Sequence, residues 1–577
     1  MKIITPAFIF SSIIFFAACN DHSRERTSSV DPNKVVITVP DSFNVTVFAK
    51  STGRARHIAV NSNGDVYVKL RTPDPKGIVA LRDENKDGVA DKREVFGDYD
   101  DEGEYGTGMR IYHGYLYFAT AGNVYRMKLT GNDLVPKSEV ELIMKDDYKN
   151  DPHGYEHIAK PITFDNNDHL YVQFGAPGDV CQERNRVPGS PGQIPCPQLE
   201  DHGGVWQFDA NKLNQTQKEG KRYATGIRSI VGMDWNPANN TLYALQHGRD
   251  DLHRTWPAFY NAWQSAVLPS EEFLKVTEGS DAGWPYYYYD HMQKKKILNP
   301  EYGGDGKKTG DGDKLNQPIV GFPGHWAPND LLFYTGDQFP ERYKNGAFIA
   351  FHGSTIRAPY PQAGYFIGFV PFRDGVPAGD FEVFADGFAG VDSIVNTSDA
   401  VFRPMALAMA PDGSLFVGES EKGWIWKITY KGDKNSFSNR QLAKMEEHKK
   451  LPHIKNPDEI KNNLILERGG KGSEVYFSYC STCHQANGEG DGNRFPPLAQ
   501  SEWVSGDKDK LIGVVLNGLQ GEVSVKGKTY NNPMPPNNFL KDEDIASVLT
   551  YIRKTFNNNN EAITPEDVNN AGDKTAK

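Results

Sequence analysis

Two cysteines and a histidine near the C-terminus have the spacing of a covalent haem site. They form the run Cys480-Ser-Thr-Cys483-His484, and C-x-x-C-H is the attachment signature of c-type haem. In such a site the two thiols add to the haem vinyl groups and the adjacent imidazole binds the iron. A thioredoxin-like redox pair is the alternative, but it would not need the histidine and normally follows a βαβ pattern. The sequence therefore predicts haem c with His484 as the proximal ligand.

The second iron ligand is predicted by elimination. Met534 is the only methionine after Cys483, and it lies between prolines in the run Asn532-Pro-Met-Pro-Pro536. Prolines restrict the backbone to extended conformations, which suits a thioether that must stay at one place. Methionine and histidine together raise the potential of a haem iron. Simple packing of the loop is the alternative role for Met534.

The residues around this motif predict a small all-α domain. Helices are expected over 472–479 and from Asp542 to about Thr555, since an acidic cluster favours a helix N-terminus. The segment 465–558 resembles a class I cytochrome c. The polar, asparagine-rich residues 559–577 are expected to form a disordered tail.

Composition places the chain among large globular proteins. It has 577 residues, 38% hydrophobic and 24% charged, with a net charge of −11. This length allows roughly two to four domains, and the apolar content is too high for a disordered chain. No block of lysine and arginine is long enough to follow a phosphate backbone, so no nucleic-acid partner is expected.

The N-terminal residues have the pattern of an export signal. Lys2 precedes an apolar stretch over 3–18, which ends in small residues just before Cys19. The pattern resembles a bacterial lipobox, although Phe16 stands where leucine is usual, and it predicts a lipoprotein signal peptide over 1–18. Cys19 would then carry the lipid that anchors the chain to a membrane, with 19–34 as a tether. Ordinary signal cleavage is the alternative, and either pattern predicts an exported protein, periplasmic or associated with the outer membrane.

Cys181 and Cys196 are the two cysteines left over. They lie fifteen residues apart in a segment rich in proline and glycine. In an oxidising compartment such a pair is expected to form a disulfide, which would stabilise the fold by about 3 kcal/mol in the chain-entropy model. Two free thiols are the alternative.

A short aromatic or aliphatic strand core recurs six times between residues 35 and 430. The cores follow turn residues and begin near positions 66, 116, 170, 242, 348 and 415. Repeats at this spacing predict a six-bladed β-propeller, because each blade is one small antiparallel sheet. A double-sheet sandwich is the alternative, but about 400 residues is long for one. The predicted fold is therefore mainly β: a six-bladed propeller over 35–430, a polar, basic linker over 431–464, and the small all-α cytochrome c domain.

Five motifs follow one another along the predicted propeller. They are Gly226-Ile-Arg-Ser-Ile-Val-Gly232, Gln246-His-Gly-Arg-Asp-Asp-Leu252, Gly283-Trp-Pro285, His352-Gly-Ser-Thr-Ile-Arg357 and Arg403-Pro404. In this order they resemble the motifs of the pyrroloquinoline quinone (PQQ)-dependent sugar dehydrogenases, closest to the sorbosone and pyranose dehydrogenase branch. The resemblance implies PQQ and calcium as cofactors, oxidation of a sugar or related aldehyde or polyol, and electron transfer to the haem. The downstream acceptor would be a soluble cytochrome or a respiratory chain.

The resemblance implies that His157 is the catalytic base, with His153 as its local rival. Glucose-type members carry an aspartate that orients the base where this chain has Ala176. Glu156 and Asp179 are the nearby carboxylates that could replace it.

The resemblance also implies the residues that hold the cofactors. Arg228 would bind the quinone carboxylates, and Arg357 and Arg403 are further candidates, since planar guanidinium groups suit carboxylates. A catalytic calcium would be held by the backbone carbonyls of Gly248 and Arg249.

Two departures from the family pattern keep other functions open. Ser229 and Val231 stand where glucose-type members carry asparagine and glutamine, which puts glucose as the substrate in doubt. One alternative is a carbohydrate-binding propeller without quinone, whose cytochrome domain is a plain electron carrier. A calcium-dependent lactonase-type hydrolase is another, although a hydrolase has no use for a haem.

A second calcium signal is independent of this resemblance. The twelve residues 83–94 fit the pattern of an EF-hand calcium loop, in which oxygen donors alternate around the ion and a glycine makes the sharp bend. The segment lies between two predicted strands, where such residues also serve as plain hairpin turns. The predicted ligands are Asp83, Asn85, Asp87, Asp91 and Glu94.

Overall fold

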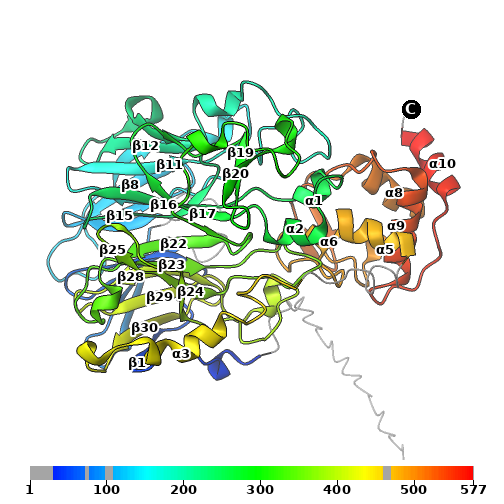
Figure 1. Ribbon diagram of the computed structural model, residues 1–577. Helices are drawn as coiled ribbons and strands as arrows, with labels where there is room; N and C mark the ends of the chain where they lie inside the picture. Colours follow the sequence, from blue (N-terminus) through cyan, green and yellow to red (C-terminus); the bar gives the residue numbers. More distant parts are fainter. Residues whose placement is uncertain (1–29, 72–76, 98–107, 459–469, 576–577) are drawn as a thin grey trace, which may run out of the picture.

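The computed structural model describes residues 30–71, 77–97, 108–458 and 470–575 (Figure 1). The predicted signal peptide, most of the tether with Cys19, and the end of the predicted linker lie outside these ranges. In the described ranges no helix has the length and apolarity needed to cross a bilayer.

Six antiparallel sheets, each with four principal strands, form the large domain. Their first strands contact one another in a ring, so the sheets are the blades of a propeller. In blade order the strands are β2 (Ala55–Val60), β3 (Val66–Leu70), β4 (Ile78–Arg82), β5 (Lys92–Phe96); β6 (Met109–Tyr112), β7 (Tyr115–Ala119), β8 (Asn123–Lys128), β9 (Glu141–Lys145); β10 (Ile162–Phe164), β11 (His169–Phe174), β12 (Gly204–Asp209), β14 (Lys221–Thr225); β15 (Ile230–Asn236), β16 (Thr241–Gln246), β17 (Glu271–Val276), β21 (Val320–Phe322); β22 (Pro328–Phe333), β23 (Ala347–Phe351), β24 (Phe366–Val370), β27 (Glu382–Ala385); and β28 (Pro404–Met409), β29 (Leu415–Glu419), β30 (Ile425–Tyr430), β1 (Phe43–Ala49).

The six strand cores predicted from the sequence are the second strands of the six blades, which confirms the propeller. The second strands are buried along most of their length, for example all five residues of β3 and of β23, because each blade packs between two others. This explains why the repeats read as nearly continuous aromatic and aliphatic runs. Short additions are β13 (Gln215–Thr216), β18 (Ser280–Asp281) and the hairpins β19 (Tyr287–Asp290) with β20 (Lys295–Leu298) and β25 (Phe372–Arg373) with β26 (Val376–Pro377).

The ring is closed by its N-terminal strand. β1 pairs antiparallel with β30, and the register runs from Phe43 opposite Tyr430 to Ala49 opposite Ile425. The sixth blade is thus built from both ends of the domain: β28, β29 and β30 come from its C-terminal end and the outer strand β1 from its N-terminal end. This pairing joins the two ends of the propeller chain. The predicted disulfide between Cys181 and Cys196 is also present, in the long loop after β11.

The C-terminal domain is helical. It contains α5 (Gly470–Tyr479), α6 (Ser481–His484), α7 (Glu502–Ser505), α8 (Lys508–Asn517) and α9 (Asp542–Lys554), with the small hairpin β31 (Val523–Val525) and β32 (Lys528–Tyr530). The helices α5 and α9 pack together around buried Val475, Ile545 and Leu549. Both predicted helices are confirmed to within two residues.

The C-terminal tail is different from the prediction. Residues 565–575, which were expected to be disordered, form the helix α10 (Pro565–Thr575), which packs on α8 and α9. Val568 and Ala571 are buried, three residues apart on one face of this helix. Thr564 and Asp567 cap its start, since the Asp567 carboxylate accepts the backbone N–H of Thr564 at 2.8 Å. The tail is polar in its overall composition, and for that reason the prediction did not recognise the short apolar face of this helix.

Much of the predicted linker is also ordered. The helix α3 (Asn439–His448) lies against β27, with Leu442 and Met445 buried. His448 and His453 each bind one carboxylate oxygen of Asp386, at 2.7 and 2.9 Å. The helical domain lies at one end of the propeller strands, next to α1 (Leu252–Thr255) and α2 (Ala262–Val267) (Figure 1).

Phe43 tests the closure of the ring. Its ring packs against Phe339, Phe384 and Tyr430 with centroids 4.9 to 5.1 Å apart. Replacing Phe43 by alanine should lower the free energy of unfolding by about 3 kcal/mol, because an aromatic cavity opens between β1 and the blades beside it. Thermal unfolding measures this change, and Val36→Ala, at a side chain 75% exposed, is the control. A shift no larger than that of the control would show that β1 does not hold the ring.

Candidate active site and haem centre

The residues predicted for catalysis, for the quinone and for the catalytic calcium lie at one face of the ring. In every blade, the loop after the second strand and the chain before the first strand meet at the same end of the sheet. His157 precedes β10, Arg228 precedes β15, and Arg403 precedes β28, whereas Gly248 follows β16 and Arg357 follows β23. Closing six blades into a ring therefore brings residues from distant parts of the sequence to one mouth.

His157 has the properties of a general base. Its Nδ1 lies 2.6 Å from the carbonyl oxygen of Ala176, so Nδ1–H donates and Nε2 is left as the basic nitrogen. Burial, followed by the positive charge of Arg228, lowers the pKa of His157 to about 4. The imidazole is therefore neutral at pH 7 and able to take a proton.

A backbone carbonyl orients this histidine. The Ala176 oxygen binds Nδ1 directly, so neither Glu156 nor Asp179 has to replace the aspartate of glucose-type members. Glu156 instead pairs with Arg186, at 2.9 Å. The close approach needs Gly175, because a Cβ there would lie 2.0 Å from the carbonyl oxygen of His157. The rival His153 is exposed.

Arg228 lies in a buried network of alternating charges. Its Nη1 donates to the carbonyl oxygen of Gly248 at 2.8 Å, and its Nη2 to Asp179 at 2.5 Å and to Asp250 at 3.3 Å. Arg186 also contacts these two aspartates, at 3.6 and 3.1 Å. The arginines hold the pKa of Asp179 and of Asp250 below the usual range despite burial. The sequence did not single out Arg186 or Asp250 for this network.

Gly248 and Arg249, whose backbone carbonyls are predicted to hold the catalytic calcium, lie in this charged network, and calcium binding there stays a prediction. The Gly248 carbonyl faces the guanidinium of Arg228, and the side chain of Arg249 pairs with Glu301 at 2.6 Å. A positive guanidinium 2.8 Å from a ligand oxygen opposes binding of a second cation there.

Arg357 is the least compensated charge of the mouth. Its side chain is 0% exposed, and none of its three guanidinium nitrogens has a hydrogen-bond partner among the described residues. Burial lowers its pKa to about 9, so it stays charged at pH 7. A buried, unpaired cation costs stability, and a bound anion would offset that cost.

Further cations surround this mouth. Arg403 donates to the carbonyl oxygens of His352 and Gly353, at 3.3 and 2.6 Å. Burial, followed by the positive charges of Arg403 and of the nearly fully buried Arg56 and Arg71, holds the pKa of His352 well below the usual range. Sequence reasoning missed Arg56 and Arg71 because the first blade matched the family motifs loosely. Their positions, at the start of β2 and just after β3, are those that carry site residues in other blades.

The haem motif has the expected local geometry. Cys480 and Cys483 are free thiols, located just before α6 and within it. His484 donates its Nδ1–H to the carbonyl oxygen of Pro496 at 2.9 Å, which leaves Nε2 for iron. Burial lowers the pKa of His484, which favours the neutral form that binds metals. Two backbone hydrogen bonds to Leu519, of 2.8 and 2.9 Å, fix the chain at Met534.

The predicted calcium loop is a hairpin between β4 and β5. Carboxylates of Asp83 and Asp91 accept backbone N–H groups, from Gly88 at 2.9 Å and from Glu84 at 2.8 Å. Glu94 lies on exposed β5. No three acidic ligand atoms within this described loop lie close enough together to hold an ion. Hydrogen bonds within the loop hold the turn in this conformation, and calcium binding there stays a prediction.

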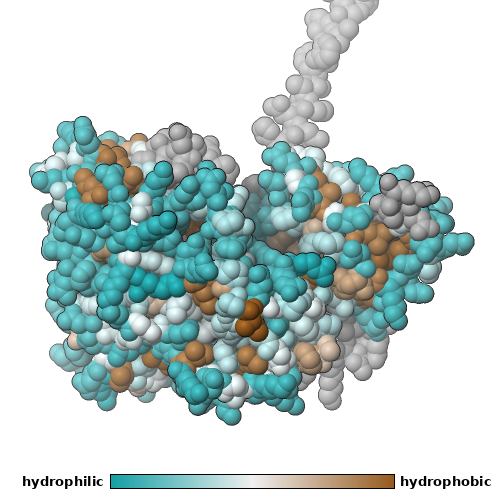
Figure 2. Space-filling view, turned by 90° about the horizontal axis from the view of Figure 1, so that it is seen from above, coloured by the Kyte–Doolittle hydropathy of each residue, from teal (hydrophilic) through white to brown (hydrophobic). Residues whose placement is uncertain are grey.

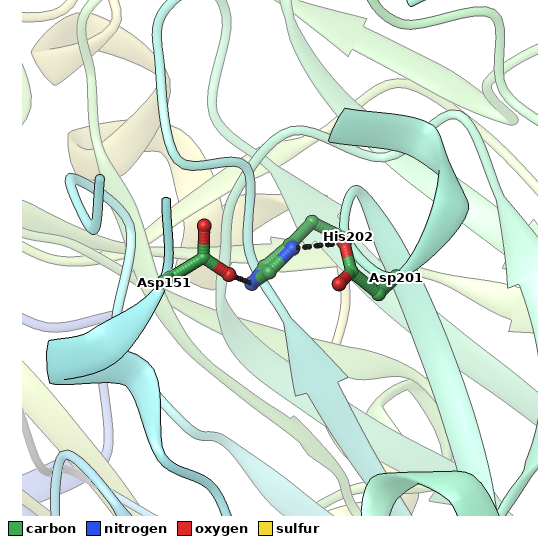
Figure 3. Close-up of side chains that lie close together, drawn as sticks. All are labelled: Asp151, Asp201 and His202. Carbon is green, nitrogen blue, oxygen red and sulfur yellow. Dashed lines mark hydrogen bonds and ion pairs between the residues drawn. The ribbon is translucent and has the colours of Figure 1, made fainter. Parts of the chain in front are cut away.

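One cluster of metal-type ligands does occur, beside the segment that carries His157 (Figure 3). His202 lies between two carboxylates, with Nδ1 2.7 Å from Asp201 and Nε2 3.3 Å from Asp151. The two carboxylates lie on opposite edges of the His202 imidazole, and one metal ion cannot bind both nitrogens of an imidazole. The cluster therefore fastens the segment before His157 to the loop after β11.

Comparisons with known proteins agree with this architecture. Residues 37–431 match the model of the TrAA12-like family, and residues 470–556 match that of cytochrome c. The first match covers more than half of the chain. The chain belongs to the TrAA12-like family. It is a TrAA12-like propeller fused to a cytochrome c domain that carries a haem c motif.

Curated relatives of this TrAA12-like chain match parts of it. An uncharacterised protein of Borreliella burgdorferi is 26% identical over 220 residues, which is 38% of this chain and 51% of that protein. Cytochrome c-552 of Thermus thermophilus is 46% identical over 85 residues, 14% of this chain and 64% of the cytochrome. The cytochrome c subunit of a quinone alcohol dehydrogenase from Gluconobacter oxydans is 33% identical over 120 residues, 19% of this chain and 24% of that subunit. The chain thus spans about half to two thirds of the first two relatives.

Solved structures share the propeller fold of the TrAA12-like domain. A family AA12 carbohydrate-active enzyme from Trichoderma reesei superposes with a TM-score of 0.56 at 17% identity, covering 70% of this chain and 100% of that one. The PQQ domain of pyranose dehydrogenase from Coprinopsis cinerea gives 0.54 at 15% identity, covering 69% and 97%. At such identities the similarity describes the fold alone.

Met534 tests the haem centre. If its thioether is the second axial ligand, Met534→Ala should lower the haem potential by on the order of 0.1 V while covalent attachment is retained. Redox titration of the purified protein measures the potential, and Met292→Ala, at a propeller methionine 40% exposed, is the control. An unchanged potential would assign Met534 to packing of the loop.

Proposed function

We propose that this chain is an exported quinoprotein dehydrogenase, which oxidises a sugar or related aldehyde or polyol with PQQ and passes the electrons to its own haem c. The observation that carries the proposal is the fully buried guanidinium of Arg357, which has no hydrogen-bond partner among the residues that the structure describes, at the same mouth as the neutral base His157. A quinone with several carboxylates supplies the anion that such a site lacks.

Arginines from three blades would hold the quinone carboxylates. Within the described part of the chain no guanidinium donor of Arg357 has a partner, whereas Arg228 and Arg403 have only some of their donors left for this role. Arg56 and Arg71 contribute positive potential from the first blade. Bound PQQ would supply the two-electron acceptor for a hydride.

The substrate hydroxyl would lose its proton to His157. As Nε2 takes this proton, the carbon–hydrogen electron pair leaves as hydride and the substrate becomes a carbonyl compound. The Nδ1–H bond to Ala176 keeps the ring oriented throughout. The imidazolium that forms lies near the carboxylates of Glu156 and Asp250, each of which already interacts electrostatically with His157. It can then release its proton to solvent.

The haem domain would accept these electrons one at a time. Its fusion to the propeller keeps the acceptor at a high local concentration. The similarity to the cytochrome subunit of a quinone alcohol dehydrogenase supports such a role. A soluble cytochrome or a respiratory chain would then reoxidise the haem.

The location is part of the proposal. Residues 1–18 would direct export and Cys19 would carry the lipid that anchors the chain to a membrane. The disulfide between Cys181 and Cys196 supports an oxidising compartment.

A carbohydrate-binding propeller without quinone is the second candidate. It is favoured by Arg228, whose guanidinium is already paired with Asp179 and Asp250. The lactonase reading has no comparable support, because a hydrolase has no use for the haem that the second domain would carry.

A visible spectrum tests the proposal directly. PQQ and then single sugars, sorbosone and polyols are added to the haem-loaded protein, and haem reduction is followed. Reduction that requires both quinone and one substrate is the expected result. If dithionite reduces the haem but no mixture does, direct titration with PQQ separates an absent quinone site from an untried substrate.

Arg357 provides a test with opposite effects on binding and stability. Arg357→Met should weaken PQQ binding at least tenfold, because the least compensated cation of the site is lost. It should also raise the unfolding temperature of the quinone-free protein, since a buried unpaired charge is replaced by an apolar side chain. Calorimetric titration and thermal unfolding measure the two effects, with the exposed Arg373→Met as control. Unchanged PQQ affinity would remove Arg357 from the site.

The pH dependence follows from His157. Its pKa is lowered to about 4, so the neutral form that accepts a proton persists down to that pH. We expect kcat/KM for the dye-linked reaction to stay level from pH 7 to pH 5 and to fall as the pH passes through about 4. A loss already complete at pH 6 would mean that His157 titrates as an ordinary histidine.

A further inference from the structure

The haem domain rests on the propeller face that carries the candidate active site. Thr355, two residues before Arg357, receives the Nη2 hydrogen bond of Arg494 at 3.2 Å. Thr397 in the loop before β28 donates to the carbonyl oxygen of Asp491 at 3.4 Å. Figures 1 and 2 show the haem domain as a smaller lobe directly against the larger one. The contacts join the mouth of the propeller to the segment just after the haem motif.

Two buried amides meet at the centre of this interface. Gln362 and Gln485 are each 0% exposed, and Gln362 Nε2 donates to Gln485 Oε1 at 3.4 Å. Gln362 also accepts the backbone N–H of Arg357 at 3.2 Å, and Gln485 is the residue after the iron ligand His484. One side-chain pair thus connects the arginine proposed to hold the quinone to the haem-binding segment. Buried amides need such partners, so the two surfaces are matched in this position.

The haem cysteines also face the propeller. The helix α1 begins directly after the Gly248–Asp250 segment and contacts α5. Charges of Asp251 and Arg254, at the start of α1, act on the buried thiol of Cys483. Arg254 in turn donates to the carbonyl oxygen of Arg186 at 3.2 Å. The cysteines that would carry the haem therefore lie near α1, which continues directly from the charged network of the mouth.

We infer that this docked arrangement is the state in which electrons pass to the haem, and that Gln362 and Gln485 are positioning residues for that step. The inference rests on the proposed function. The rate of electron transfer falls steeply with distance. Transfer is therefore faster when the arginines proposed to hold the quinone stay in contact with the haem-binding segment than when the two domains meet only by chance on a tether. Each transfer moves one electron from the reduced quinone to the ferric haem, with the quinone proton released to solvent.

A disulfide across the interface can lock the docked state. A Cβ placed on Gly492 would lie 3.3 Å from the Cβ of Ser398, close to the separation found in disulfides. We compare the rate of haem reduction, with substrate and PQQ present, in the cross-linked double variant Ser398→Cys with Gly492→Cys and in two single-variant controls, Ser398→Cys and Gly492→Ala. The rate in the double variant should lie within about twofold of the rate in each control. The second control carries the backbone strain of a side chain at φ +75. A loss of tenfold or more only in the cross-linked protein would overturn the inference, because the domains would then have to separate for transfer.

Removing the amide contact is the complementary test. Gln485→Leu should slow substrate-driven haem reduction at least tenfold, while reduction of a dye by the quinone and the haem potential stay unchanged. Gln500→Leu is the matched control, since Gln500 is also a glutamine with positive φ in the haem domain but is exposed. Equal haem reduction in both variants would overturn the inference.

Cross-linking gives a readout that needs no quinone. In the Ser398→Cys, Gly492→Cys background, the haem-loaded protein should form its disulfide more slowly with Gln485→Leu than with Gln500→Leu. Equal rates would show that the amides do not hold the domains together. If the unmodified chain shows no dye reduction with any quinone and substrate, the proposed function fails instead, and the cross-linking result still stands for the docking.

Discussion

The pairing of β1 with β30 is the constraint on which the rest of the molecule depends. It closes six sheets into a ring, and only a closed ring brings the loops of all blades to one mouth. His157, Arg228, Arg357 and Arg403 come from four blades and have no local reason to be neighbours. Their common location is a consequence of topology, since equivalent loops of a propeller share a face.

Charge at this mouth is only partly balanced. Asp179 and Asp250 compensate Arg186 and Arg228, whereas Arg357 has no carboxylate partner among the described residues. The paired charges of Arg186 and Arg228 with the two aspartates are a permanent part of the fold. Under the proposed function, Arg357 is the cation that the bound quinone would neutralise.

Much of this could be predicted from the sequence, and the failures have physical reasons. Strand cores and the haem motif are local patterns, so both were predicted at the right residues. The Ala176 carbonyl was missed as the partner of His157 because a backbone atom leaves no trace in residue type. Arg56 and Arg71 were missed because the first blade matches the family motifs only loosely, so no local pattern marked them as site residues.

The prediction that the C-terminal tail is disordered was wrong for another reason. Its low apolar content indicated disorder, yet two buried side chains three residues apart were enough for a helix with a surface to pack on. Tertiary packing, more than helix propensity, decides whether a short helix forms.

That terminal helix fixes where the haem domain ends. Val568 and Ala571 belong to the same apolar core as Ile512 and Leu549, so a fragment cut after α9 would expose that core to water. Truncation at the apparent end of the cytochrome fold would therefore yield a less stable electron acceptor. Fusion partners and affinity tags belong beyond residue 575, and haem attachment is best compared between chains that keep α10.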